Sequence, residues 1–124
     1  MELNLSTLPH TWLIDIDGTI FKHNSHLNDN QEKLLDGVKE FFANIPKHDF
    51  IILISAREEK YKLSTIKSLK YYDISFDDII FGVPTGERII INDEKPSGLK
   101  TAYAINIIRD IGLNDLVLKI DSTL

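Results

Sequence analysis

Continuous apolar runs alternate with amphipathic stretches along this chain. The runs are too uniformly apolar for strands with one wet face, so they predict strands covered on both faces, as in a parallel sheet. The predicted strands cover residues 11–17, 50–55, 78–82 and 88–93, and a final strand or edge segment covers 115–120. Apolar residues at helical spacing predict helices over 29–45, 58–71 and 98–111.

Strands that alternate with helices predict an α/β fold. The expected form is a three-layer α/β/α sandwich around an open, parallel, Rossmann-like sheet. A chain of 124 residues has the size of one domain, 1–124. In such a fold the ligand lies beyond the carboxyl ends of the strands, so polar residues at those ends are candidates for function.

The first predicted strand ends in two acids, Asp15 and Asp17, followed by Gly18. Side chains alternate along a strand, so both carboxylates are expected to point the same way. Two like charges this close repel each other unless a cation, a shared proton or a phosphate-linked reaction uses them. Ser55 and Asp93 follow two other strands. A polar turn needs only one acid, which favours function over a simple turn at the first strand.

Composition narrows the function classes. The net charge of −5 argues against a nucleic-acid partner, which normally meets a basic face. Cysteine is absent, which excludes disulfides and thiolate chemistry and fits a cytoplasmic location. No apolar run reaches the roughly 20 residues of a membrane span, and the first residues do not form a signal peptide. We therefore expect no membrane partner.

Three stretches together resemble the haloacid dehalogenase (HAD) superfamily of phosphotransferases. The run Asp15-Ile16-Asp17-Gly18-Thr19 matches the first motif of that family, and a strand that ends in Ser55 matches the second. A strand that ends in Asn92-Asp93 matches the fourth. The resemblance covers residues 11–96. Ser55 alone is a weak signal, because a serine there could equally cap the next helix.

The resemblance implies a phosphatase that works through an aspartyl-phosphate. Asp15 would be the nucleophile, and Asp17 would be the general acid and then the general base. Mg²⁺ would be held by Asp15, by Asp17 through its carbonyl, and by Asp93. Ser55 and the backbone N–H groups of the loop that ends at Gly18 would bind phosphate oxygens.

The third motif is where this chain departs from the family. Compact members carry a lysine in a Gly-Lys-Pro run, but the equivalent here is Gly82-Val83-Pro84. The nearest substitutes are Lys95, which we favour, and Arg88, for which an ordinary surface charge is an equally good interpretation. The stretch Asn92–Ala102 is similar to a small subgroup linked to capsule and other polysaccharide biosynthesis, which suggests a sugar phosphate as substrate.

Neither gap between the motifs has room for the cap domain of larger family members, so we expect an open site. A second copy of the chain could cover it as a homo-oligomer. The local alternative is a lid from the loop at residues 21–29, where His23 and His26 could contact a sugar. A solvated polar loop explains these histidines equally well.

Two other functions compete with hydrolysis. One is a receiver-like signalling module, which also binds Mg²⁺ and forms an aspartyl-phosphate. Receivers carry adjacent acids at the first strand and the acceptor at the third, unlike Asp15, Asp17 and Ser55 here. The other is a member that binds phosphate without turnover, an alternative that the missing lysine keeps open.

Overall fold

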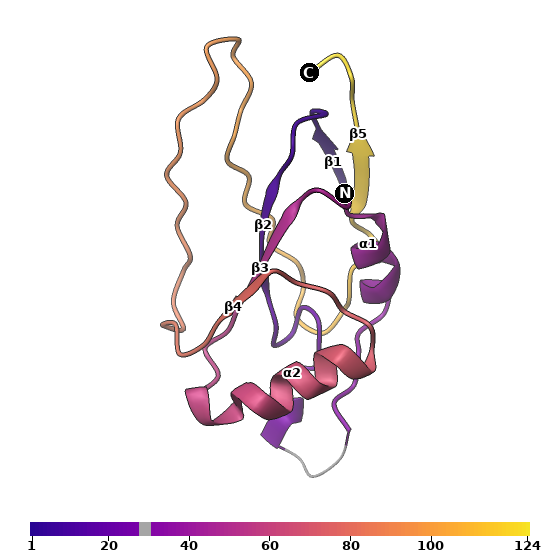
Figure 1. The fold of residues 1–124 in the computed structure, drawn as a ribbon, viewed down its shortest axis with the longest axis vertical. Helices are drawn as coiled ribbons and strands as arrows, with labels where there is room; N and C mark the ends of the chain where they lie inside the picture. Colours follow the sequence, from indigo (N-terminus) through magenta and orange to yellow (C-terminus); the bar gives the residue numbers. More distant parts are fainter. Residues whose placement is uncertain (28–30) are drawn as a thin grey trace.

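The protein, described by a computed structural model over residues 1–27 and 31–124, has an α/β fold with two parallel sheets (Figure 1). One sheet has the order β2-β3-β4 and the other pairs β1 with β5. The strands are β1 (Glu2–Leu5), β2 (Thr11–Asp15), β3 (Phe50–Ile54), β4 (Asp78–Ile80) and β5 (Val117–Ile120). In the larger sheet Ile14 pairs with Leu53, and Leu53 pairs with Ile79.

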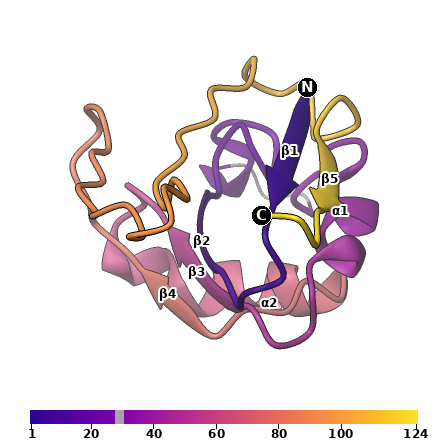
Figure 2. The same cartoon turned by 90° about the horizontal axis from the view of Figure 1, so that it is seen from above.

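Two α-helices and two short 3-10 helices accompany the strands in the part of the chain that the structure describes. They are η1 (Ser25–Leu27), α1 (Val38–Asn44), η2 (Glu59–Tyr61) and α2 (Lys62–Tyr71). α2 lies below the three-stranded sheet in Figure 1, whereas α1 lies beside β5 (Figure 2). No helix in residues 1–27 and 31–124 is long and apolar enough to cross a membrane.

The core lies between the larger sheet, α1 and α2. Its completely buried members come from the turn after β2, from β3 and from both helices, and they include Ile16, Phe21, Val38, Leu53 and Leu69. Trp12 packs edge-on against Phe41 of α1, with ring centroids 5.7 Å apart. The residues directly after β2 are also core residues, so core packing holds the end of this strand in place.

Most strand predictions are confirmed. The predicted strands at 11–17, 50–55, 78–82 and 115–120 contain β2, β3, β4 and β5. The helix predicted over 58–71 is present as η2 followed by α2. The last strand has a partner that the sequence did not predict, since β1 lies beside it in parallel register.

The helix predicted over 29–45 is shorter in the structure. Residues 28–30 lie outside the described residues, and α1 begins only at Val38. Before it, Leu34 forms a bridge with Phe21, and the Leu35 N–H donates to the carbonyl of Ile20 at 2.9 Å. Gly37 then adopts a left-handed φ of 74°, which a helix interior does not accept. Pairing with the turn after β2 therefore replaces the first half of the predicted helix.

The strand predicted at 88–93 and the helix predicted at 98–111 are wrong. Both stretches are irregular and largely exposed. They belong to the long segment between β4 and β5, here called the excursion, which rises beside the strands in Figure 1. A strand needs a neighbouring strand for its N–H and C=O groups, and no strand among the described residues pairs with 88–93. A short helix needs an apolar face packed on a core, but Tyr103 and Ile108 are exposed.

Candidate functional site

A pocket of about 480 Å³ opens where β2 ends. Asp15 and Asp17 both line it, so the structure brings the two predicted acids to one cavity. Side chains from four other parts of the chain complete the wall, among them His23, His26, Tyr61, Arg57, Arg88 and Arg109. The pocket therefore combines two carboxylates with three guanidinium groups.

Asp15 is the last residue of β2, and its carboxylate is held by two donors. The Nη1 of Arg88 donates to Oδ1 at 2.8 Å, and the Thr19 hydroxyl donates to Oδ2 at 3.3 Å. The Asp15 side chain is 32% exposed, so it is reachable from the pocket. Its partner Arg88 is the point at which the long excursion after β4 touches the acidic pair.

The turn after Asp15 is tightly closed on itself. The carbonyl of Ile16 accepts the N–H groups of Thr19, Ile20 and Phe21, and the N–H of Gly18 donates to the carbonyl of Phe21 at 2.7 Å. Gly18 has a φ of 80°, a conformation that favours glycine. A side chain at Gly18 would also meet Arg109, whose Cγ lies 3.0 Å from the position of the missing Cβ. The Gly18 N–H, which was predicted to bind phosphate, donates within the turn instead.

Asp17 forms a bidentate ion pair with Arg57. The Nε of Arg57 donates to Asp17 Oδ2, and Nη2 donates to Oδ1, both at 3.0 Å. Arg57 also donates to both oxygens of Glu32, from Nη1 at 3.0 Å and from Nη2 at 2.5 Å. Burial disfavours the charged guanidinium, but the hydrogen bonds to Glu32 and Asp17 outweigh it and raise the pKa of Arg57.

His26 reaches the same carboxylate from η1. Its side chain is 9% exposed, and its Nδ1 lies 3.6 Å from Asp17 Oδ1, too far for a hydrogen bond. Among the described residues this buried Nδ1 has no hydrogen-bond partner. Burial lowers the pKa of His26, and the Arg57 cation lowers it further against the opposing effect of Asp17 and Glu32. The imidazole packs edge-on against Tyr61, with centroids 4.7 Å apart.

Ser55 follows β3, as predicted, but its hydroxyl serves the local backbone. Its Oγ accepts the N–H of Arg57 at 3.0 Å, and the residue is completely buried. Ser55 does not cap a helix either, because the residue before η2 is Glu58. The serine thus shapes the turn that carries Arg57 toward Asp17.

The two basic residues predicted for phosphate binding lie in different places. Arg88 lies in the pocket, on Asp15. Lys95 lines a separate groove of about 800 Å³ beside β1 and β2, which holds neither Asp15 nor Asp17. A further cation, Arg109, lines the pocket and forms no ion pair with any acid in the described part of the chain.

Asp93 is not brought to the acidic pair. It lies in the exposed excursion, where its carbonyl accepts a hydrogen bond from the Thr101 hydroxyl, and it does not line the pocket. Within the described ranges no group of three or more acids or histidines could hold a metal ion. The carboxylate of Asp15 and the backbone carbonyl of Asp17 still fit Mg²⁺, which is commonly held by one or two carboxylates together with water and substrate phosphate.

Glu32, Arg57 and Arg109 contribute to the site but lie outside the sequence-based predictions. Arg57 had a usable signal, because it stands two residues after Ser55 at the end of an apolar strand. Glu32 lies 25 residues before Arg57, in a stretch predicted to be helical. Arg109 was hidden in the helix predicted over 98–111. In the structure the adjoining Asp110 donates its N–H to the Gly18 carbonyl at 3.0 Å, which brings Arg109 to the turn.

Comparisons with protein-family models, with curated proteins and with solved structures find no match for this chain.

Proposed function

We propose that this protein is a Mg²⁺-dependent phosphomonoester hydrolase that acts through an aspartyl-phosphate on Asp15. The observation that carries the proposal is that Asp15 and Asp17 share one pocket with three arginines. A carboxylate nucleophile, a neighbouring carboxyl group for proton transfer and cations for phosphate are the parts that such a reaction needs.

In the first step a carboxylate oxygen of Asp15 attacks phosphorus. The bond between phosphorus and the alcohol oxygen breaks, and its electron pair stays on that oxygen. Asp17, in its protonated form, gives its proton to the leaving oxygen, so that a neutral alcohol departs. Asp15 is 32% exposed, which suits a nucleophile that a substrate must reach.

In the second step water attacks phosphorus and breaks the acyl-phosphate bond. Asp17 is now ionised and takes the proton of the attacking water. The products are inorganic phosphate and a regenerated Asp15 carboxylate. Because Asp15 and Asp17 face one cavity, a single bound phosphate can meet both groups in turn.

Arg88 is our choice for the basic residue that compensates phosphate charge. Arg88 donates to Asp15, so a phosphate next to Asp15 would lie close to the same guanidinium. Asp15, through its carboxylate, and Asp17, through its backbone carbonyl, would hold Mg²⁺, with Asp93 as a further ligand only after the excursion moves. When bound, Mg²⁺ would neutralise charge on the transferring phosphoryl group.

The substrate we favour is a sugar phosphate or a similar small metabolite. The pocket of about 480 Å³ is of the size usual for small-molecule sites. His26, with its unpaired Nδ1, and His23 lie where the alcohol part of such a substrate would sit, in the loop predicted as a lid. A role in polysaccharide biosynthesis, a cytoplasmic location and a covering second copy remain predictions from the sequence.

The proposed architecture is a three-layer α/β/α sandwich with a parallel Rossmann-like sheet, without a cap domain. It is supported by the parallel pairing of β2, β3 and β4 and by α2, whose buried Leu69 belongs to the same core as Leu53 of β3.

A second candidate is a phosphate-binding module without turnover, including a receiver-like one. The observation that favours it is that Arg88 and Arg57 already pair with Asp15 and Asp17. A module of this kind would bind Mg²⁺ and phosphate but release no alcohol.

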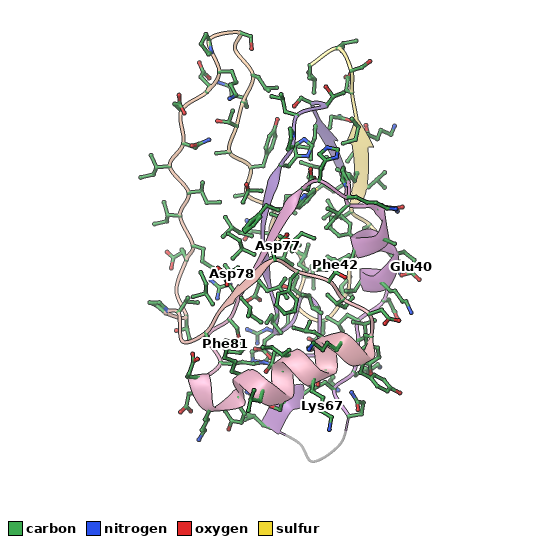
Figure 3. All side chains as sticks on the ribbon, viewed as in Figure 1. Glu40, Phe42, Lys67, Asp77, Asp78 and Phe81 are labelled. Carbon is green, nitrogen blue, oxygen red and sulfur yellow. The ribbon has the colours of Figure 1, made fainter. Side chains whose placement is uncertain are left out.

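The deciding experiment is hydrolysis of p-nitrophenyl phosphate and a panel of sugar phosphates with Mg²⁺. We expect wild-type turnover, and a loss of about three orders of magnitude or more in Asp15→Asn because the nucleophile is gone. Asp78→Asn is the matched control, since Asp78 is an exposed acid at the start of β4 and not at the end of a strand (Figure 3). Activity that survives Asp15→Asn would overturn the nucleophile, and Mg²⁺ binding without any turnover would favour the silent module.

A further inference from the structure

We infer that Arg57, held in place by Glu32, is a positioning residue that fixes the carboxylate of Asp17 for proton transfer to the leaving group. The inference rests on the proposed function, because it assigns Arg57 a part in the first chemical step. It rests on an ion-pair network that the sequence-based predictions did not contain.

All donor groups of Arg57 are used. A guanidinium has five N–H donors in a fixed planar fork, and five hydrogen bonds leave Arg57. Two go to Asp17, two go to Glu32, and the fifth runs from Nη1 to the hydroxyl of Thr65 at 2.9 Å. No donor remains for a phosphate oxygen, so Arg57 acts through Asp17 and not on the substrate.

The anchoring side of this network is buried. The side chains of Arg57 and Glu32 are 0% and 6% exposed. Glu32 is itself held by the hydroxyl of Ser25, which donates to Oε1 at 3.0 Å. Beneath the guanidinium lies the ring of Phe21, with its centroid 5.8 Å from Cζ. A guanidinium anchored in this way keeps its orientation when a substrate binds. It therefore fixes the orientation of the carboxylate that it binds on its other side.

The other end is a pocket residue. Asp17 is 16% exposed and lines the cavity together with Asp15. Glu32 and Thr65 belong to the buried interior and take three of the five donors, and the other two are directed at a carboxylate that lines the pocket. The bidentate bond to Asp17 fixes the rotation of a carboxylate that the reaction needs in one direction. General acid catalysis depends on that direction, because the proton must lie within hydrogen-bond reach of the leaving oxygen.

The test separates positioning from stability with a double variant, Glu32→Leu with Arg57→Met. Replacing a buried ion pair by apolar residues of similar volume is often neutral or stabilising, whereas removing one partner strands a buried charge. We expect the double variant to unfold cooperatively near the wild-type temperature. Arg57→Met alone should be much less stable, because it leaves Glu32 and Asp17 without their cation.

The kinetic readout is the dependence of kcat/KM on the leaving group. This constant reports the step in which the alcohol leaves, and p-nitrophenolate needs little protonation whereas a sugar or glycerol alkoxide needs it fully. In the double variant we expect kcat/KM to fall about 100-fold on glycerol phosphate and less than about tenfold on p-nitrophenyl phosphate. Wild-type values on both substrates, or equal losses on both, would overturn the positioning role. Glu59→Leu with Lys62→Met, an exposed pair outside the pocket, is the control for the substitutions themselves.

If the wild type hydrolyses neither substrate, that result counts against the proposed function alone. The positioning of Asp17 by Arg57 is then tested by a measurement that needs no turnover. With every N–H engaged, the Nη groups of Arg57 should give separate, slowly exchanging proton resonances in ¹⁵N NMR. In Asp17→Ala the Nε–H signal should exchange faster, while the Nη1 signals held by Glu32 and Thr65 persist. Averaged Nη resonances in the wild type would refute the fixed fork.

Discussion

Strand β3 and residues 88–92 are both rich in isoleucine, but most of β3 is buried or half-buried and residues 88–92 are exposed. β3 is Phe-Ile-Ile-Leu-Ile, and the later stretch contains Ile89-Ile90-Ile91. Leu53 in β3 is completely buried, whereas Ile91 is 93% exposed. The difference is in the neighbours, because β3 lies between β2 and β4 and residues 88–92 pair with no described strand. An apolar run becomes a buried strand only where partners supply both hydrogen bonds and cover.

The same contrast divides the chemistry. The part of the chain before the excursion supplies Asp15, Asp17 and Arg57, with their contacts fixed by the core. The excursion supplies Arg88, which is 36% exposed and touches the site through one ion pair. Positioning therefore comes from the packed region, and the excursion adds the charge of Arg88 through a single ion pair.

Hydrogen exchange should show the largest difference between the two regions. Amides of β3 should exchange more slowly than those of residues 88–92 by a factor of about 10⁴ or more, because they open only with the core. The measurement is residue-resolved exchange followed by NMR or mass spectrometry. Comparable protection in both stretches would show that 88–92 is paired in solution and would break the comparison.

Side-chain truncation should separate the regions next. Leu53→Ala should lower the free energy of unfolding by about 2–5 kcal/mol, since it removes a fully buried side chain from the core. Ile91→Ala should change it by less than about 0.5 kcal/mol. Denaturant titrations of both variants provide the test. A large loss in Ile91→Ala would mean that this residue is buried in the folded protein.

Within the excursion, Arg88 and Lys95 should differ. Arg88→Ala should lower kcat/KM about 10- to 100-fold, because a charged hydrogen bond to phosphate contributes about 1.5–3 kcal/mol. Lys95→Ala should change it less than about twofold, since Lys95 lines the other groove. Steady-state assays on one phosphate ester compare the two variants directly. The reverse order would restore Lys95 as the third-motif residue.

The smallest expected effect concerns acid stability of the packed region. Burial acts to raise the pKa of Asp49, but hydrogen bonds from Trp12 and His10 outweigh it and leave that pKa below its ordinary value. A folded-state pKa below the unfolded one stabilises the protein above the unfolded value, near pH 4, and this stabilisation is lost as the pH falls through the folded value.

Between pH 6 and pH 2.5, we therefore expect the free energy of unfolding to fall by about 1 kcal/mol less in Asp49→Asn than in the wild type. Thermal unfolding across that range, with exposed Asp78→Asn as the control, gives the comparison. Identical pH profiles for wild type and Asp49→Asn would contradict the assignment.

Local pattern was enough to predict the parts of the fold that have strong periodicity and near neighbours. The runs that became β2, β3 and β4 and the helix at α2 follow from apolar spacing alone. The acidic pair at Asp15 and Asp17 was predictable because strand alternation and the following glycine are local features. Both residues do line one pocket.

The remainder depends on contacts between distant residues. Nothing local in residues 31–37 indicates that Leu34 would pair with Phe21 instead of joining a helix. Likewise, Glu32 and Arg57 meet across 25 residues of sequence. Such pairs are set by tertiary packing, which a single sequence does not display.

The ion pairs around the pocket leave it close to electrical neutrality. Arg88 offsets Asp15 and Lys60 offsets the pocket residue Glu58, while the unpaired charge of Arg109 offsets the excess acid around Arg57. A phosphate dianion that enters adds two negative charges to a pocket whose arginine charges already offset its acids. A divalent cation and the phosphate should therefore each raise the affinity for the other, and by the same factor in both directions.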